Sequence, residues 1–400
     1  MTGTDRTQSP VPFFGRPPRA AQAQPPAHAH DHAPRHEHGP AGRPVRCGIV
    51  PPYLLARLAT VDDPRFSAAA EAARRSLRVD DPIRSLRAAP HLPTVRPVAT
   101  APAVPGALRR TISDAHQLQS LPGRIVRTEG QPPVNDIAVN EAYTGLGDTH
   151  ELFWRRYQRD SIDGRGLQLD ATVHYGQAYD NAFWDGERMV FGDGDGEVFN
   201  RFTTSLSVIA HELTHGVTQY SANLVYQGQS GALNESVSDV FGALVEQYAT
   251  GQDTATASWL IGAGLFTDEV EGRALRSMKA PGTAYDDDVL GKDPQPGSMD
   301  DYIDTEDDYG GVHLNSGIPN RAFYLVADAI GGNAWEAPGQ IWYDTLTGPI
   351  LTANATFAGF ARATETAAVT RYGLDSLEHE AVRAGWDGVG LTLDPLRAAS

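Results

Sequence analysis

The chain has 400 residues, 40% of them hydrophobic, which is enough for two to three domains with real cores and excludes a small disulfide-stabilised scaffold. Its formal net charge of −17 argues against a nucleic-acid-binding protein, whose affinity would come from neutralising phosphates. The charge is unevenly divided. Residues 1–110 carry 16 basic and 8 acidic residues, a net +8, whereas residues 111–400 carry 17 basic and 42 acidic residues, a net −25. The first 110 residues therefore have the character of an accessory or processed segment.

Residues 1–46 consist mainly of Pro, Ala, Arg and His without an apolar period, so we expect a disordered tail. Its histidines are spaced for loose metal chelation, although a solvated arm without a specific role is the favoured interpretation: His28, His30, His32, His36 and His38. The N-terminus lacks the basic start and apolar stretch of a secretory signal, and no stretch approaches the length of a membrane span.

An apolar segment, CGIVPPYLLARLA, follows at residues 47–59, and an Ala-rich helical pattern at residues 66–77. Linker composition returns at residues 90–105. The single thiol, Cys47, allows no intramolecular disulfide, so oxidising and reducing compartments are both compatible with the composition. We treat residues 47–108 as a pro-segment and linker.

From about residue 111 the pattern changes to short strand-like runs, among them residues 172–175 and 189–191, the second closed by Gly-Asp-Gly-Asp-Gly. A helical period begins at Thr203, and a second apolar stripe runs from Leu233 to Tyr248. Further Ala-rich helical stretches follow from Asn315. The sequence thus predicts a β-rich part followed by a helical part.

The sharpest motif is His211-Glu212-Leu213-Thr214-His215 in the first of these helices. Positions i and i+4 share a helix face, so both imidazoles can bind one Zn²⁺ while Glu212 faces the open side of the metal. Chance would produce this pattern in such a chain with a probability of about 0.02, so two unrelated histidines are a minor alternative.

Independent support lies twenty residues downstream in Asn234-Glu235-Ser-Val-Ser-Asp239, where Glu235 and Asp239 are again at i and i+4. A carboxylate here can supply the third zinc ligand, and Asn234 and Asp239 suit hydrogen bonds to the outer N–H groups of the ligating histidines. The alternative is the acidic face of an ordinary solvated helix.

The stretch HELTHGVTQYSANLVY…GALNESVSD, preceded by NAFWDGERMVFGDGDG and followed by LRSM and DDYGGVHLNSG, resembles a thermolysin-family metalloendopeptidase over roughly residues 120–390. The segment CGIVPPYLL resembles the short propeptide of the protealysin-type branch. The resemblance implies an α+β fold with two lobes: a β-rich N-terminal catalytic lobe at residues 109–222 and a mainly helical C-terminal catalytic lobe at residues 223–400. The HExxH helix would lie between them.

Carried over residue by residue, the resemblance implies one catalytic zinc ion held by His211, His215 and Glu235, with Asp239 bonded to His211 and Asn234 supporting His215. Glu212 is then the general base that accepts a proton from a zinc-bound water, which attacks the peptide carbonyl. Further positions match the family's oxyanion donors and the carboxylate that orients the histidine: Tyr226, His313 and Asp308.

Substrate binding follows from the same resemblance. Asn181 and the backbone of Ala182 match the edge that pairs with an extended peptide, and Arg276 matches an arginine that binds a substrate carbonyl. The positions of the S1′ pocket are all apolar, which implies cleavage before a bulky hydrophobic residue: Phe202, Val208, Ile261 and Leu275.

The sequence departs from the larger family members at their double calcium site. Only Glu246 remains acidic among those positions, and the others are Ser207, Ser258, Leu260 and Ala263. Calcium prefers six to eight oxygen ligands, so we expect zinc without this calcium site.

These features predict a neutral endopeptidase made as a zymogen, whose own pro-segment is an intramolecular inhibitor removed somewhere in residues 88–110. Cys47 could occupy the open zinc position, but we favour the interpretation that it is a small apolar contact.

We expect peptide or protein substrates, a monomer, and no nucleic-acid or membrane partner. The family implies secretion; without a recognisable signal, a cytoplasmic location is the alternative. An inactive binding module, a metal-handling protein centred on the His-rich arm, and an aminopeptidase are the competing functions.

Overall fold

The computed structural model describes residues 48–85 and 104–394. The expectations for the His-rich tail and for Cys47 therefore lie outside the described residues, as does most of the 88–110 stretch in which we expect maturation. In the part of the chain that is described, no helix is long and apolar enough to cross a lipid bilayer.

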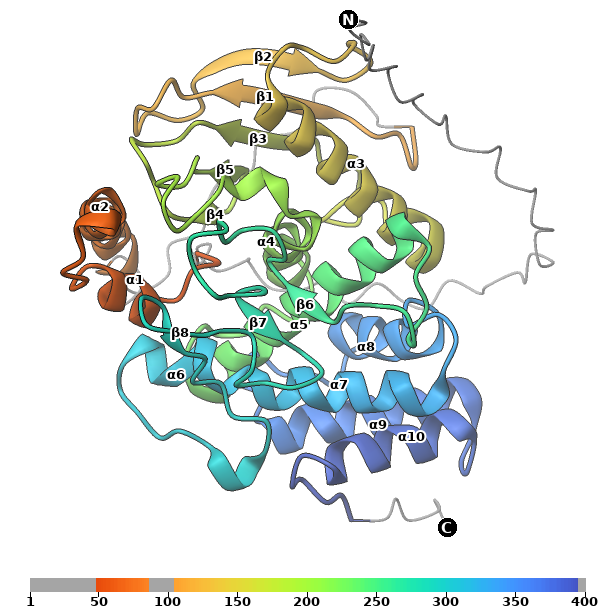
Figure 1. Cartoon of the computed structure of the whole chain (residues 1–400). Helices are drawn as coiled ribbons and strands as arrows, with labels where there is room; N and C mark the ends of the chain where they lie inside the picture. Colours follow the sequence, from red (N-terminus) through yellow and green to blue (C-terminus); the bar gives the residue numbers. More distant parts are fainter. Residues whose placement is uncertain (1–47, 86–103, 395–400) are drawn as a thin grey trace, which may run out of the picture. The chain divides into compact units, whose positions relative to one another are not determined.

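A mixed sheet builds the N-terminal lobe (Figure 1). The described strands lie in the order β2-β1-β3-β5-β4, with β1–β3 and β3–β5 parallel and the other neighbours antiparallel. Their bounds are β1 (Arg110–Asp114), β2 (Arg124–Thr128), β3 (Leu169–Val173), β4 (Ala182–Trp184) and β5 (Met189–Phe191). The expected strand at residues 189–191 is present. The strand expected at 172–175 instead begins at Leu169 and ends at Val173, because His174 adopts a left-handed backbone with φ 54°.

Two long helices carry the motifs found in the sequence. The first, α4 (Leu206–Gln219), begins three residues later than the expected Thr203. The second, α5 (Gly228–Thr250), begins before Asn234, so Glu235 lies inside the helix. The helices approach closely at Gly242, where an ideal Cβ would lie only 2.6 Å from the Ser207 carbonyl oxygen. A side chain at this position would push the helices apart, so glycine allows their contact.

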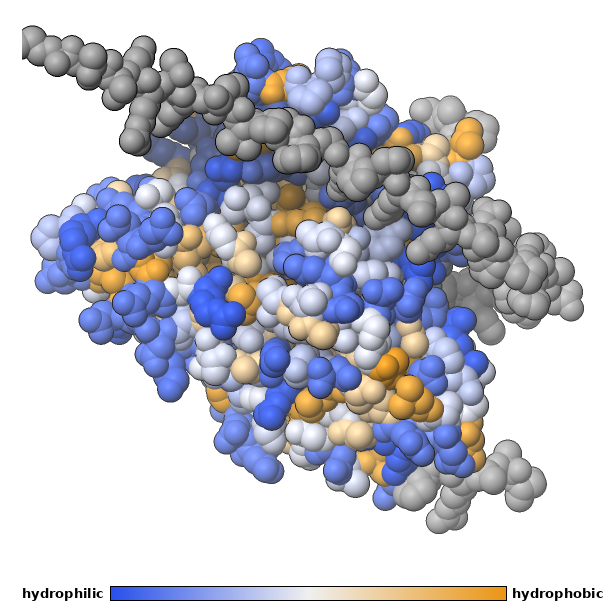
Figure 2. Space-filling view, turned by 45° about the vertical axis from the view of Figure 1, so that its right-hand side comes forward, coloured by the Kyte–Doolittle hydropathy of each residue, from blue (hydrophilic) through white to orange (hydrophobic). Residues whose placement is uncertain are grey.

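The C-terminal lobe is mainly helical, as the sequence predicts, and its helices pack around the buried Trp342 and Trp386, whose rings are stacked 6.3 Å apart. Its helices are α6 (Asp308–Asn315), α7 (Gly317–Ile330), α8 (Ala337–Thr347), α9 (Phe357–Tyr372) and α10 (Leu377–Asp387). Two short antiparallel pairs precede them, β6 (Leu260–Ile261) with β7 (Arg276–Ser277), and β8 (Asp286–Asp287) with β9 (Gly291–Lys292). In the space-filling view of Figure 2, hydrophobic residues (orange) lie among hydrophilic ones (blue) in the lower part of the molecule.

The segment that precedes the catalytic lobes contributes to their core. Its helices are α1 (Pro52–Leu58) and α2 (Ser67–Ser85), the second overlapping the helical pattern expected at residues 66–77. Leu54, Leu55 and Leu58 are buried in the same cluster as the apolar residues of α4 and α5. The extended residues just before α1 run beside β4 (Figure 1). This placement brings the pro-segment to the edge of the sheet nearest α4.

Candidate metal centre and catalytic site

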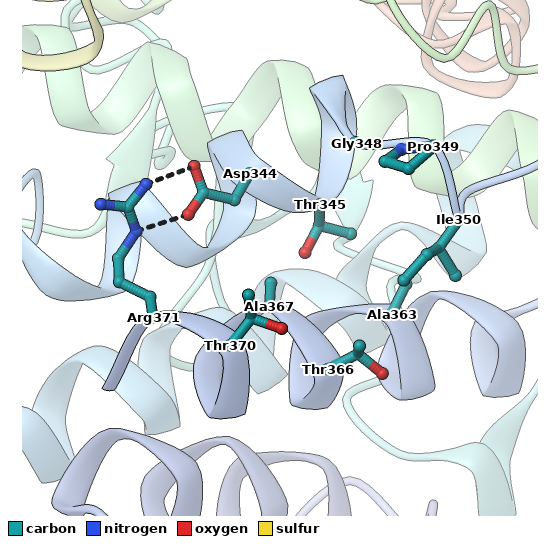
Figure 3. Close-up of a pocket in the computed structure, with 10 residues that line it drawn as sticks. All are labelled: Asp344, Thr345, Gly348, Pro349, Ile350, Ala363, Thr366, Ala367, Thr370 and Arg371. Carbon is teal, nitrogen blue, oxygen red and sulfur yellow. Dashed lines mark hydrogen bonds and ion pairs between the residues drawn. The ribbon is translucent and has the colours of Figure 1, made fainter. Parts of the chain in front are cut away.

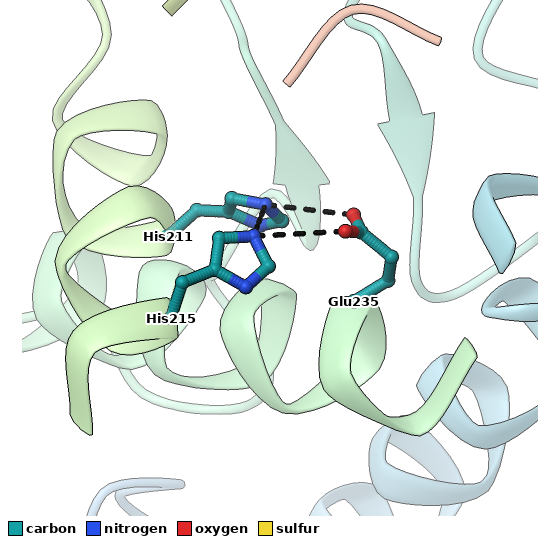
Figure 4. Close-up of side chains that lie close together, drawn as sticks. All are labelled: His211, His215 and Glu235. Carbon is teal, nitrogen blue, oxygen red and sulfur yellow. Dashed lines mark hydrogen bonds and ion pairs between the residues drawn. The ribbon is translucent and has the colours of Figure 1, made fainter. Parts of the chain in front are cut away.

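Three buried side chains from α4 and α5 converge on one point (Figure 4). The Nε2 atoms of His211 and His215 are 3.1 Å apart, and each lies 3.6 Å from a carboxylate oxygen of Glu235. Among the described residues this is the one group of three or more His, Cys, Asp or Glu whose ligand atoms converge in this way. The sequence-predicted ligands are therefore brought together.

The chemistry of these donors fits a zinc ion. His211 Nδ1 is 2.7 Å from Asp239 Oδ1, and His215 Nδ1 is 2.9 Å from Asn234 Oδ1. Because these oxygens accept hydrogen bonds, both Nδ1 atoms carry the proton, and both Nε2 lone pairs face Glu235. Tetrahedral ligands at zinc distances lie about 3.3–3.5 Å from one another, close to the 3.1–3.6 Å observed.

Burial and charge set the protonation of this cluster. Burial lowers the pKa of His215 to about 4, which favours the neutral ring that a metal requires. Burial acts to raise the pKa of Glu235, but His313, His215 and His211 together bring it well below its usual value. The carboxylate is thus held in its charged, ligating form.

Two hydrogen-bonding residues at this centre were not predicted from the sequence. Ser238 Oγ lies 3.1 Å from His215 Nδ1, and Asn320 donates from Nδ2 to Asp239 Oδ2 at 2.8 Å. Ser238 occurs within the NESVSD motif, one turn from Asn234, and could have been found by helical spacing. Asn320 lies on α7, 81 residues from its partner, and no local pattern marks it.

Glu212 is fully buried beside the histidines, and its Oε2 accepts the N–H of Trp184 at 3.0 Å. Burial and the nearby Glu235 raise the pKa of Glu212 well above its usual value. This carboxyl group therefore has the raised proton affinity that a group exchanging protons near neutral pH needs.

Tyr226 and His313 both contact the Glu235 carboxylate. Tyr226 Oη donates to Glu235 Oε1 at 2.5 Å and lies 3.3 Å from His313 Nε2. Asp308 holds His313 by two contacts, 2.7 Å to Nδ1 and 2.9 Å to the backbone N–H. Although burial lowers the pKa of His313, Asp308 and Glu235 raise it on balance, which favours a ring that donates hydrogen bonds.

A left-handed turn brings Asp308 and His313 together. Tyr309, Gly310 and Gly311 have φ of 54°, 82° and 71°, conformations that only glycine adopts without cost. An ideal Cβ on Gly311 would lie 2.9 Å from the Asn315 side chain, so the turn also requires a residue without a side chain at this position. The Gly-Gly pair thus folds Asp308 back onto a histidine five residues later.

Comparison with known proteins agrees with this geometry. The description "Thermolysin metallopeptidase, catalytic domain" matches residues 115–219, and "Thermolysin metallopeptidase, alpha-helical domain" matches residues 222–391. An extracellular metalloprotease of Pectobacterium carotovorum subsp. carotovorum is 52% identical over 351 residues, covering 87% of this chain and 97% of the relative. The chain belongs to the thermolysin family of metallopeptidases.

Two further relatives define the branch. Protease PrtS of a Photorhabdus species is 49% identical over 289 residues, covering 71% of this chain and 76% of the relative. The solved precursor of protealysin, a metalloproteinase from Serratia proteamaculans, matches with a TM-score of 0.78 and 48% identity over 86% of this chain and all of that chain. The predicted thermolysin-like fold with two lobes is confirmed, and the chain is a protealysin-like metalloendopeptidase.

The predicted substrate-binding residues of this thermolysin-family chain are also close together. Asn181 precedes β4, Ala182 begins it, and Arg276 lies on β7, all of them buried. The predicted S1′ residues belong to one buried apolar cluster, which also contains Ile49 of the pro-segment: Phe202, Val208, Ile261 and Leu275. Arg276 has a second contact that the sequence did not reveal, an ion pair with Asp239.

The backbone of residues 48–50 bonds to the predicted substrate-binding residues. Ile49 N–H donates to the Ala182 carbonyl at 3.0 Å, and Arg276 donates to the Ile49 carbonyl at 3.1 Å. Val50 N–H donates to Asn181 Oδ1 at 2.9 Å, and Gly48 forms an antiparallel bridge with Phe183. In Figure 4 a short salmon stretch, which has the faded colour of the residues before α1, lies above the three side chains in the view.

Two of the positions that match the family's double calcium site, Ser207 and Glu246, interact with each other. Burial raises the pKa of Glu246, although a hydrogen bond from Ser207 opposes the effect. Ser207 Oγ also accepts the Gly262 N–H at 3.1 Å. The hydroxyl of Ser207 therefore contacts the carboxyl group and the loop that follows β6.

A cavity of about 420 Å³ lies apart from this centre, between α8 and α9 (Figure 3). Arg371 forms two hydrogen bonds with Asp344 at its mouth, at 2.6 and 3.0 Å, and small side chains such as Ala363 and Ala367 line it. None of the predicted site residues is among those that line it.

Proposed function

We propose that this chain is a zinc-dependent neutral endopeptidase made as a latent precursor, which cleaves peptide bonds before bulky hydrophobic residues. The observation that carries this proposal is the extended pro-segment backbone beside β4, where Ile49 and Val50 bond to Ala182, Asn181 and Arg276. A peptide substrate would use the same groups, because an extended chain adds to an open sheet edge through its backbone. The pro-segment thus excludes a substrate by occupying its binding groups.

In this proposal His211, His215 and Glu235 hold the metal. A bound zinc ion supplies a Lewis acid that polarises the peptide carbonyl and activates water. Asp239 and Asn234 fix the ring orientations and the protonated Nδ1 atoms, which leaves Nε2 as the ligand on each histidine.

Glu212 accepts the proton of the attacking water and delivers it to the nitrogen of the departing amine. Tyr226 and His313 donate hydrogen bonds to the oxygen on which charge develops, and Asp308 keeps His313 in the donating orientation. Asn181, Ala182 and Arg276 align the peptide. The buried apolar residues Phe202, Val208, Ile261 and Leu275 would receive the side chain after the cleaved bond.

We further propose that this enzyme holds no calcium at Ser207, Glu246, Ser258, Leu260 and Ala263. The one carboxyl group there, Glu246, is hydrogen-bonded to Ser207 and supplies too few oxygens for calcium. Relatives named extracellular support an extracellular location, and we expect a monomer that acts on peptides or proteins. The domain bounds of residues 109–222 and 223–400 stay a prediction.

The test is hydrolysis of a quenched-fluorescent peptide with a single Leu after the cleavable bond, by the zinc-loaded full chain after activation. We expect cleavage before Leu, loss of activity with a chelator, and a fall of about 10²–10⁴-fold in kcat/KM for Glu212→Gln. Glu187→Gln, at an exposed residue of the same lobe, is the matched control and should retain full activity. An inert chain with zinc bound, or equal losses in both variants, would contradict the proposal.

A further inference from the structure

The Gly48–Ile49 peptide bond runs along β4, the strand whose last residue is bonded to Glu212. Gly48 is paired with Phe183 in the middle of β4, and Ile49 N–H donates to the carbonyl of the preceding Ala182. The next strand residue, Trp184, donates its N–H to Glu212. The edge of β4 therefore aligns Gly48 and Ile49 next to the carboxyl group proposed as the general base.

The contacts of Ile49 distinguish its two peptide bonds. Its carbonyl oxygen is held by Arg276, which pairs with Asp239, itself bonded to the metal-binding His211. Its amide N–H donates to the Ala182 carbonyl, one residue before Phe183 and two before Trp184, whose own N–H donates to the Glu212 carboxyl group. The nitrogen that β4 holds in this way belongs to the Gly48–Ile49 bond, and this nitrogen must receive a proton when that bond breaks.

The side chains fit the same register. Ile49 is apolar and fully buried, as a hydrophobic residue after a cleaved bond would be. Gly48 lies so close to the sheet edge that an ideal Cβ would come within 2.4 Å of Asn181 Nδ2. Glycine therefore permits the close approach of the backbone that precedes Ile49.

We propose that the precursor cuts its own chain between Gly48 and Ile49, a processing site separate from the maturation expected in residues 88–110. The inference rests on the proposed peptidase function. The C–N bond between Gly48 and Ile49 breaks, and the oxygen of one water molecule bonds to the Gly48 carbonyl carbon. Glu212 passes a water proton to the Ile49 nitrogen. The products are a carboxylate at Gly48 and a free amino group at Ile49, and residues 1–48, including the His-rich arm, leave the protein.

The experiment follows the zinc-loaded full chain by intact-mass spectrometry and N-terminal sequencing. We expect a product that begins Ile-Val-Pro-Pro-Tyr and forms with a rate constant unchanged over a hundredfold dilution, because the reacting bond is in the same chain. Glu212→Gln should stay uncut. Ile49→Asp should slow this cut at least tenfold, because a charge is unfavourable in an apolar pocket, whereas Ile49→Leu should restore it. Ala68→Asp, at an exposed position of α2, is the matched control and should be cut like the unchanged chain.

Hydrogen exchange of the uncut Glu212→Gln chain provides a readout independent of catalysis. The amides of Ile49 and Val50 should exchange slowly, because they donate to Ala182 and Asn181. If these two amides exchanged as fast as those of an unfolded chain, the pairing of residues 48–50 with β4 would be wrong. A chain that cleaves added peptide yet keeps the 48–49 bond would overturn only this inference. A zinc-loaded chain that cuts neither its own 48–49 bond nor, after activation, an added peptide would instead refute the proposed peptidase.

Discussion

Arg276 and Asp239 form a two-point ion pair in the interior, with Nε donating to Oδ2 at 2.8 Å and one terminal nitrogen donating to Oδ1 at 2.9 Å. Both side chains are fully buried. Burial acts to raise the pKa of Asp239, but Arg276 and His211 bring it down to about 2. Since the other terminal nitrogen of Arg276 donates to the Ile49 carbonyl, one guanidinium links the proposed peptide-binding groups to the candidate metal centre.

Removing this guanidinium should therefore affect stability and metal binding together. Arg276→Gln leaves the buried Asp239 charge without its ion-pair partner, and we expect the free energy of unfolding to fall by about 3–5 kcal/mol. Because Asp239 orients His211, zinc affinity should fall about 10–100-fold. Urea unfolding and competition with a fluorescent chelator measure the two effects. Arg371→Gln, which breaks the more exposed pair with Asp344, should cost less than about 1 kcal/mol. Similar losses in both variants would contradict the assignment.

The Tyr226 hydroxyl should matter for the reaction rate more than for substrate binding. Tyr226→Phe removes the group that lies 3.3 Å from His313 Nε2, and we expect kcat to fall about 10²–10³-fold with little change in KM or zinc content. Steady-state kinetics and metal analysis of the same preparations test this expectation. Tyr372→Phe on α9 is the control. A rise in KM with unchanged kcat would show that the hydroxyl binds substrate instead.

His174 makes the stability of the N-terminal lobe depend on pH. Its ring nitrogens lie 2.8 Å from Asp193 and 2.8 Å from Asp136, the N-cap of α3 (Ile137–Tyr157). The hydrogen bond with Asp193 is the largest effect, and with that from Asp136 it raises the pKa of His174 to about 9 despite partial burial. Because the folded-state pKa exceeds the unfolded value of about 6.5, this stabilisation is complete below pH 6.5 and is lost as the pH rises through about 9.

His174→Gln should remove the stabilisation that the protonated ring provides at low pH. We expect the variant to be less stable than the unchanged chain by about 1–2 kcal/mol at pH 6, after discounting for solvent screening, with the difference shrinking between pH 6.5 and 9. Thermal unfolding of the uncut Glu212→Gln chain over this pH range measures it without interference from proteolysis. His116→Gln, at a more exposed histidine, should differ by less than about 0.5 kcal/mol. A stability difference between the two chains that grows as the pH rises would contradict a raised pKa of His174.

Metal analysis tests the proposed ion content. After dialysis against buffer containing both metals at trace levels, we expect about one zinc and no tightly held calcium per chain. His211→Ala should lose the zinc without any change in calcium. Zinc together with two further stoichiometric calcium ions would contradict the proposed loss of the calcium site at Glu246.

The sequence predicts those parts of the site whose residues are close in the chain. His211, Glu212 and His215 follow helical spacing, and Glu235 lies in a motif on the next helix, so local periodicity places them on faces that meet. Asn320 and the Arg276–Asp239 pair could not be predicted in this way, because the contacts depend on how distant elements pack. The start of α5 at Gly228 was also missed, since the polar stretch before Leu233 lacks an apolar period. The position of Ile49 beside Ala182 depends on the register with which the extended residues before α1 pair with β4. A short segment does not specify that register by itself.

The position of β4 at the end of the sheet has a consequence for solubility. An exposed sheet edge carries backbone donors and acceptors that can pair with any other extended chain, including a second copy of the protein. In the precursor, Gly48 and Ile49 cover this edge by bonding to Phe183 and Ala182. We therefore expect the uncut protein to resist strand-to-strand aggregation during folding better than the fully processed enzyme, so the pro-segment would protect the sheet edge that it covers.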